Sequence, residues 1–159
     1  EGWRWLDAAY FTSMMLTTIG FGDYVPKTVA GKICAVTLSL CGIAIITKAV
    51  TRIGDSSVSN VRNSSLFNIR DGLLFTVLLF AVYIGSGTLI FSFLERISLD
   101  QSCWMSFDAL STVGLGSIVP TTDQGKIAMI IYSYLGIGVM AQIINTLVYQ
   151  IKPLKKLKK

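Results

Sequence analysis

The sequence contains no histidine and only three cysteines in 159 residues. These residue types supply most zinc ligands in proteins, and histidine is the usual acid–base group near neutral pH. Cys34 and Cys41 lie within one apolar run, where a thiol usually packs as a small group, and no cysteine pair has metal-ligand spacing. We therefore expect no cofactor. A membrane enzyme or scaffold is disfavoured because a nucleophile–base pair is also missing.

Charged side chains are scarce, at 14% of the residues, and the mean hydropathy is +0.62. This combination argues against an ordinary water-soluble domain. The nearly charge-free runs 33–47, 72–94 and 127–151 are predicted to span a membrane, because about 20 apolar residues cover a hydrocarbon core of ~30 Å. The first run is short, so Lys32 and Lys48 are expected to extend along their stems to the two interfaces.

Basic residues are unevenly distributed along the chain, whose net charge is +5. Four of them flank or occupy the polar segment 54–70, namely Lys48, Arg52, Arg62 and Arg70, and five lysines lie in the tail 152–159. By the positive-inside rule this segment and the tail are cytoplasmic, and 1–31 and 95–126 face outward. We expect a multi-pass protein, most simply of the plasma membrane.

The tail lysines, at 152, 155, 156, 158 and 159, allow two interpretations. They attract anionic membrane lipids, at about 1 kcal/mol per residue near the surface, or they only fix the orientation of the chain. Nucleic acid is disfavoured as a partner, because no helix-turn-helix or aromatic-interleaved pattern accompanies the basic residues.

Two copies of one unit follow each other at a separation of 94 residues, as Gly114 follows Gly20. The other identities noted at this separation are Gly22 and Gly116, Pro26 and Pro120, Gly31 and Gly125, Lys32 and Lys126, and Ile33 and Ile127. Each copy consists of a short amphipathic helix, a glycine-containing extended segment, an outward loop ending in proline, and a spanning helix. Between the copies, segment 54–70 is rich in serine, asparagine and arginine and is expected to be a solvated linker with little helix.

The second copy has a preceding span, 72–94, whose counterpart in the first copy would lie upstream of Glu1. The first residues do not resemble a secretory signal, and the sequence begins without methionine. We therefore expect a fragment of a longer chain.

The short helices are predicted over 7–17 and about 102–111. Both are too short to cross a bilayer, so each is expected to enter the membrane and return on the same side. The non-helical backbone that follows can lie at that depth only if it is buried in protein or lines a wet cavity.

Glycines alternate with apolar residues in that backbone, in TIGFG at 18–22 and TVGLG at 112–116. Because glycine reaches positive φ without steric cost, such a segment can turn consecutive carbonyls to the same side. Several segments around an axis would form rings of oxygen, to which the Thr18 and Thr112 hydroxyls contribute, and such cages suit a dehydrated cation. The apolar side chains Ile19, Phe21, Val113 and Leu115 would then point away from the axis and pack against the short helices.

Other glycines have a simpler interpretation. Close helix packing is the favoured role of Gly42, Gly85, Gly87, Gly136 and Gly138, and some of them are alternatively hinges. A nucleotide-binding loop is disfavoured, because GFGDYV matches neither G-x-G-x-x-G nor a P-loop.

The stretches TTIGFGDYVP and STVGLGSIVP resemble the first and second pore signatures of two-pore-domain potassium channels, and the resemblance covers essentially the whole chain. It implies an all-α membrane protein with the potassium-channel pore fold, re-entrant pore helices, extended selectivity-filter loops and a tandem repeat. The expected divisions are a first pore loop and helix at 1–53, a linker at 54–70, a second pore repeat at 71–151 and a basic tail at 152–159.

In that family two subunits, each with two pore loops, surround one pore. The resemblance therefore implies a homodimer, with a heterodimer as an alternative, and K⁺ as the permeant ion. Its ion-coordinating residues fall on Thr18, Ile19, Gly20, Phe21, Gly22, Thr112, Val113, Gly114, Leu115 and Gly116. The family's first membrane helix and extracellular cap are not in this sequence.

Two positions near the second filter depart from expectation. Ser117 stands where the family commonly has aspartate, whereas the first repeat keeps Asp23. Asp108, which replaces Met14 of the first repeat, is hypothesised to brace the second filter by accepting hydrogen bonds from backbone N–H groups or from the Ser117 hydroxyl. The alternative is a water-exposed acid favoured by the helix dipole.

The predicted function is passive, potassium-selective conduction, in which filter oxygens replace the hydration shell of the ion. The spans contain no ladder of regularly spaced arginines, which favours a leak conductance over voltage sensing. The alternative is a potassium transporter of related pore-loop architecture.

Overall fold

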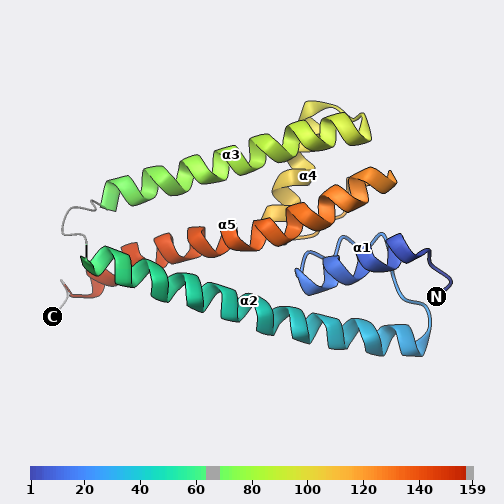
Figure 1. Cartoon of the computed structure of the whole chain (residues 1–159), viewed down its shortest axis with the longest axis horizontal. Coiled ribbons are helices and arrows are strands. Elements are labelled where there is room, and N and C mark those ends of the chain that lie inside the picture. Colours follow the sequence, from blue (N-terminus) through green and yellow to red (C-terminus); the bar gives the residue numbers. More distant parts are fainter. Residues whose placement is uncertain (64–68, 157–159) are drawn as a thin grey trace.

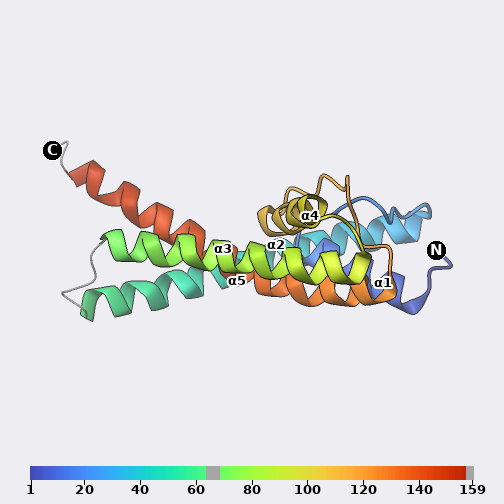
Figure 2. The ribbon, with the colours of Figure 1, turned by 90° about the horizontal axis from the view of Figure 1, so that it is seen from above.

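The computed structural model describes the backbone of residues 1–63 and 69–156, and the side chains of 1–48, 51–52 and 73–146. Within these residues the regular secondary structure is entirely helical. The helices are α1 (Trp5–Leu16), α2 (Val29–Asn63), α3 (Ile69–Glu95), α4 (Leu99–Ser111) and α5 (Asp123–Lys156). The three long helices run along the long axis of the molecule, and both short helices lie near the N-terminal end (Figure 1, Figure 2).

Three segments are long and apolar enough to cross a membrane, which confirms the three predicted spans. They are Val29–Lys48, Leu73–Glu95 and Asp123–Thr146, with hydropathies of 2.1, 2.2 and 1.9. Many of their large side chains remain exposed in the single chain; Ile33 is 63% and Phe93 83% accessible. Such exposure is expected where lipid or another chain covers the surface.

Helix occupies most of the segment 54–70 that is described, because α2 continues to Asn63 and α3 begins at Ile69; residues 64–68 lie outside the described backbone. The expectation of little helix there is wrong. The residues 55–63 include no proline, and the helix propensities of serine, asparagine and valine differ by only a few tenths of a kcal/mol. A helix that has already formed therefore propagates through them, because each added residue gains a hydrogen bond without a new nucleation step.

Helices α1 and α4 confirm the two predicted short helices. Helix α1 packs against α2 and α5, and α4 packs against α3 and α5, so α5 touches both. The loops that follow them return to the same end of the molecule, opposite the end that carries residue 63 and the C-terminus (Figure 1).

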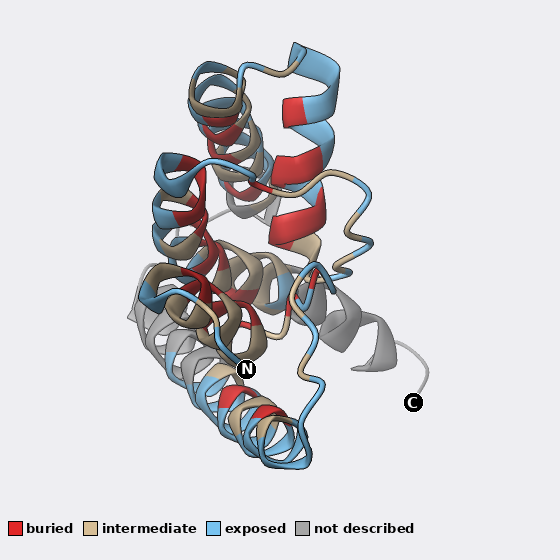
Figure 3. Ribbon diagram, turned by 90° about the vertical axis from the view of Figure 1, so that its right-hand side faces the viewer, coloured by how far each residue is buried: buried red, intermediate tan, exposed pale blue. Residues whose placement is uncertain are grey.

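Buried side chains gather on the faces that the helices turn toward one another (Figure 3). In the centre, Tyr83 of α3 and Tyr132 of α5 stack at 4.2 Å, and each hydroxyl donates to the main-chain carbonyl of the other residue, at 2.6 and 3.1 Å. This reciprocal pair fixes the register of α3 against α5.

Three of the predicted packing glycines have close neighbours. A Cβ at Gly136 would lie 2.6 Å from the Tyr83 hydroxyl, and one at Gly42 would overlap the main-chain carbonyl of Leu16. Gly87 similarly makes room for the Tyr132 hydroxyl. Gly85 and Gly138 face open space, so the packing interpretation is not supported for them within this chain.

Candidate functional site

The segment after each short helix has a backbone in which every second residue is left-handed. In the first repeat φ is +59° at Thr18, +59° at Gly20 and +82° at Gly22. The equivalent values in the second repeat are +54° at Thr112, +62° at Gly114 and +65° at Gly116. Positive φ is rare for threonine. Its occurrence at the equivalent residues Thr18 and Thr112 indicates that this backbone conformation has a function.

The two glycine segments, which come from different repeats, lie side by side. The carbonyl oxygen of Ile19 faces Gly114, and that of Phe21 faces Gly116, so closely that a Cβ at either glycine would overlap the oxygen. Glycine is therefore required at these two positions both by φ and by the approach of the neighbouring backbone.

The side chains between the glycines differ in their surroundings. Ile19 and Phe21 are buried, as predicted. Val113 and Leu115 are each 60% accessible, so the prediction that they pack against the short helices is wrong for this chain. The reason is that α1 contacts α2 of its own repeat and also α5 of the other repeat, whereas α4 contacts α3 and α5 of its own repeat and, within the described part of the chain, no spanning helix of the other repeat.

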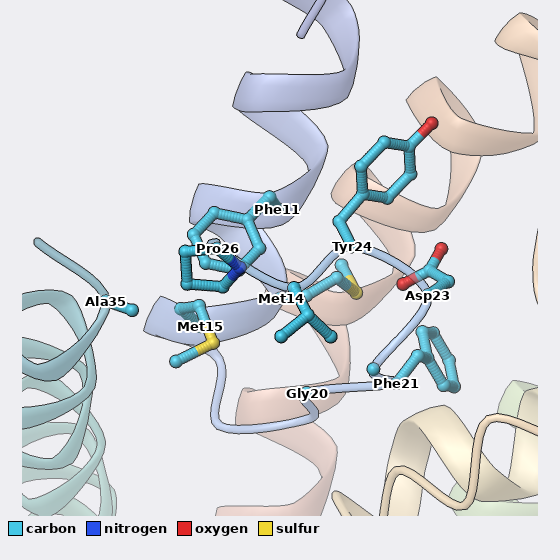
Figure 4. A pocket seen from close by; sticks show the side chains of 11 residues that line it. Phe11, Met14, Met15, Gly20, Phe21, Asp23, Tyr24, Pro26 and Ala35 are labelled. Atoms are coloured by element: carbon cyan, nitrogen blue, oxygen red, sulfur yellow. The ribbon is translucent and has the colours of Figure 1, made fainter. Parts of the chain in front are cut away.

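A cavity of about 230 Å³ lies beside the first segment. Phe11, Met14 and Met15 of α1, Ala35 of α2 and the outer loop to Pro26 border it (Figure 4). Gly20 and Gly22 also line it, and apart from the adjacent residues no described atom lies within 4 Å of the Cβ positions of these two glycines.

The first segment is anchored at its inner end by main-chain contacts. The carbonyl of Met14 accepts hydrogen bonds from the N–H groups of Ile19 and Gly20, at 3.0 and 3.2 Å. Thr17, which is fully buried, donates its hydroxyl to the Ser13 carbonyl at 2.8 Å. The end of α1 thus turns directly into the segment.

The second segment is anchored at its outer end by a side chain. Asp108 is 1% accessible, and its carboxylate accepts hydrogen bonds from the N–H groups of Leu115, at 3.0 Å, and Gly116, at 3.3 Å. The hypothesis that backbone donors bind Asp108 agrees with this geometry, and the water-exposed alternative does not. The Ser117 hydroxyl accepts a hydrogen bond from the Trp104 ring nitrogen at 3.0 Å, and no hydrogen bond joins Ser117 to Asp108 within the described side chains.

Asp23, the first residue after the first glycine segment, is exposed and lies near the buried Tyr10 of α1. Burial and the neighbouring Asp23 carboxylate raise the pKa of Tyr10. The Tyr10 hydroxyl makes no hydrogen bond within the described part of the chain. Asp23 and Ser117 therefore occupy equivalent positions with different contacts.

A family model described as "Ion channel" matches residues 1–58 and 73–152, which is most of the chain. The chain belongs to this ion-channel family. The resemblance to two-pore-domain potassium channels that the two signatures indicate is confirmed by its relatives.

Among these relatives, "Potassium channel subfamily K member 1" of Homo sapiens is 31% identical over 178 residues, covering 99% of this chain and 53% of that protein. "Potassium channel subfamily K member 16" of Homo sapiens is 27% identical over 142 residues, covering 83% and 46%. "Two pore potassium channel a" of Oryza sativa subsp. japonica is 26% identical over 159 residues, covering 87% and 46%. The chain spans about half the length of these curated relatives.

Two carboxylates of this ion-channel chain were missed in the sequence. Glu1 accepts hydrogen bonds from the N–H groups of Lys27 and Thr28, at 3.0 and 2.9 Å, and Glu95 accepts from those of Thr121 and Thr122, at 3.0 and 3.1 Å. Each carboxylate thus ties the residues before a short helix to the end of the loop that leads into the next span. The contacts with Thr28 and Lys27 lower the pKa of Glu1 to about 2. The signal was available, since Glu95 follows Glu1, and Thr122 follows Thr28, by the same 94 residues.

Proposed function

We propose that this chain belongs to a subunit of a potassium-selective leak channel and that residues 18–22 and 112–116 form its selectivity filter. The observation that carries the proposal is the alternation of φ at Thr18, Gly20 and Gly22, repeated at Thr112, Gly114 and Gly116. With that backbone, consecutive carbonyls turn toward one side and can replace the water around a K⁺ ion. Several such sites in a row, each of moderate affinity, allow ions to leave as readily as they enter.

A complete ring needs a second copy of the chain. Gly114 and Gly116 are met by carbonyls of the first segment, whereas Gly20 and Gly22 face open space. If the same contact repeats around an axis, the Val113 and Leu115 carbonyls of a second copy approach Gly20 and Gly22. That arrangement gives a ring of four segments from two chains, as a homodimer or with a related subunit.

The exposed side of α4 supports the same assembly. Trp104 and Phe107 are 44% and 43% accessible, whereas the equivalent residues of α1, Tyr10 and Ser13, are buried. Helix α5 packs against α1, and α2 is the helix equivalent to α5 in the first repeat. We infer that α2 of the second copy covers α4, and that lipid covers the remaining apolar surface of the spans.

The orientation is proposed from the charges of the sequence, with the linker and tail in the cytoplasm of a plasma-membrane protein. The lysines of the tail are candidates for binding anionic lipid, and their side chains lie outside the described part of the structure. A transporter is not favoured, because relatives of this chain are named as channels. The same relatives support a non-enzymatic role.

The test is the reversal potential of the full-length subunit reconstituted in bilayers, measured under a K⁺ gradient and then with Na⁺ replacing K⁺ on one side. A channel of this kind holds the membrane near the K⁺ equilibrium potential and passes current at all voltages. Absence of current, or equal permeation of K⁺ and Na⁺, would refute the proposal.

A further inference from the structure

A buried lysine connects three segments at the outer end of the first repeat. Lys126, in the first turn of α5, is 5% accessible. Its ammonium donates to the Asp7 carboxylate of α1 at 2.6 Å and to the Tyr24 hydroxyl at 2.7 Å. Tyr24 is the second residue after Gly22, so Lys126 joins the start of a spanning helix to the exit of the first filter segment.

Two further charged residues complete this network. Arg4 donates to Asp7 at 3.0 Å and to Asp123 at 2.6 Å, so two cations face two carboxylates. Hydrogen bonds from Arg4 and Lys126 hold the pKa of Asp7 well below its usual range. Arg4 and Asp123 lie at the exposed rim, whereas the side chains of Lys126 and Asp7 are only 7% and 10% accessible.

Aromatic packing limits the freedom of Tyr24. Its ring contacts Trp3 at 5.5 Å and Tyr10 at 5.9 Å, both nearly perpendicular to it. The hydroxyl is therefore aimed at Lys126 by the ring contacts, and Lys126 is in turn held by Asp7. A buried ion pair is a weak means of stabilising a fold compared with apolar packing of the same volume, but it fixes the relative position of the elements that carry it.

The second repeat does not carry the same network. At the positions 94 residues away, Lys32 is retained, but Asp7 is replaced by Gln101, and Tyr24 by Ile118. Arg4 and Asp123 correspond to Ser98 and Val29. Lys32 is exposed in this chain. The carboxylate and hydroxyl that would receive the lysine are thus present only beside the first filter segment.

We propose that Lys126 is a positioning residue for the first filter segment, which it holds at its outer end by binding Tyr24 while Asp7 fixes the ammonium. Asp108 serves the second segment in the corresponding place, through a different contact. This inference rests on the proposed function, because its readout is ion selectivity.

The experiment uses the full-length subunit and compares Tyr24→Phe, Lys126→Met, the double variant, and Lys126→Arg. Tyr24→Phe keeps the ring and removes only the hydroxyl, so we expect a two- to tenfold fall in the K⁺/Na⁺ permeability ratio, roughly the range that one hydrogen bond supplies. Lys126→Met should lower the ratio by about tenfold or more, since it also leaves Asp7 without its buried partner. The permeability ratio of the double variant should be no lower than that of Lys126→Met. Lys126→Arg keeps the positive charge and should retain most of the wild-type ratio.

Lys32→Met is the matched control, the same change at the equivalent helix position, and should leave the ratio within about twofold of the wild type, the lower limit of a single hydrogen bond's effect. Surface protein is quantified for each variant. If Lys126→Met does not reach the membrane, Tyr24→Phe decides alone. An unchanged ratio in Tyr24→Phe, or additive effects in the double variant, would overturn the inference while leaving the proposed function intact. A wild type without K⁺ selectivity would instead refute the proposed function.

Discussion

Position 14 of the first repeat and position 108 of the second are equivalent, but each supports its glycine segment with a different group. Met14 uses its main-chain carbonyl, which accepts from Ile19 and Gly20 at the inner end. Asp108 uses its carboxylate, which accepts from Leu115 and Gly116 at the outer end. The first segment is held at its outer side by other residues, through Lys126 and Tyr24.

This difference shows that two glycine segments of similar sequence and backbone are supported by different contacts. A main-chain contact survives most substitutions, because any residue carries the carbonyl, whereas a carboxylate contact depends on one side chain. We therefore expect the second repeat to be more sensitive than the first to replacement at this position. The following variants of the full-length subunit, ordered from the largest expected effect, test that expectation.

Gly114→Ala should abolish most of the K⁺ current. The added Cβ would overlap the Ile19 carbonyl, and φ is +62°, where a side chain costs about 1–2 kcal/mol. The measurement is whole-cell current normalised to surface protein. Gly85→Ala is the control, since Gly85 is helical and faces open space, and its current should be unchanged.

Gly20→Ala sharpens the comparison, because its φ of +59° is similar, but its Cβ position is open among the described residues beyond its two chain neighbours. If a second copy covers Gly20, this variant should be as damaging as Gly114→Ala. A clearly milder effect would contradict the proposed ring of four segments.

Asp108→Met gives the second repeat the residue of the first. The N–H groups of Leu115 and Gly116 would lose their acceptors, at about 1–3 kcal/mol for each donor that stays buried and unpaired. We expect a marked fall in the K⁺/Na⁺ permeability ratio, and a smaller fall in Asp108→Asn, which keeps one acceptor oxygen.

Met14→Leu is the matched change in the first repeat. It conserves volume and leaves the carbonyl in place, so it should alter stability by less than about 1.5 kcal/mol and leave selectivity unchanged. If Met14→Leu and Asp108→Met lowered the K⁺/Na⁺ permeability ratio equally, the different support of the two repeats would have no effect on selectivity.

Glu95→Gln should lower the thermal stability of the purified protein modestly, by roughly 1 kcal/mol, because Glu95 is half-buried and accepts from both Thr121 and Thr122. Glu1→Gln should have a smaller effect, since Glu1 is exposed. A larger effect at Glu1 would reverse this ranking of the two contacts.

The contact of Glu1 should not respond to moderate acid. The pKa of the Glu1 carboxyl is 4.5 in the unfolded chain and is lowered to about 2 in the folded chain. The contribution of Glu1 to stability is therefore fully present above its unfolded-state pKa and is lost as the pH falls toward its folded-state pKa. The difference in melting temperature between wild type and Glu1→Gln should therefore be constant from pH 7 to pH 5.5. A difference that shrinks across this interval would contradict the lowered pKa.

The periodic and repeated features of this chain were predictable from the sequence. The apolar runs predicted the three spans, and the alternating glycines of TIGFG and TVGLG predicted the alternation of φ. Asp108 was found because it breaks the repeat. Each of these signals is local or recurs at a fixed separation.

What escaped prediction depends on contacts between distant residues. Asp7 and Lys126 are 119 residues apart, and no periodicity relates them. The extension of α2 to Asn63 was missed because a polar composition is compatible with either helix or loop. The exposure of Val113 and Leu115 depends on which helices cover α4, and the sequence of one chain does not specify that.

The central claim is that the carbonyls of residues 18–22 and 112–116 coordinate K⁺ around a shared axis. It is tested most directly by locating Tl⁺, a K⁺ substitute with strong anomalous scattering, in crystals of the full-length assembly. The account predicts a row of Tl⁺ sites on the axis between four such segments. Segments that lie apart, or an axis without ordered Tl⁺ beside them, would contradict it.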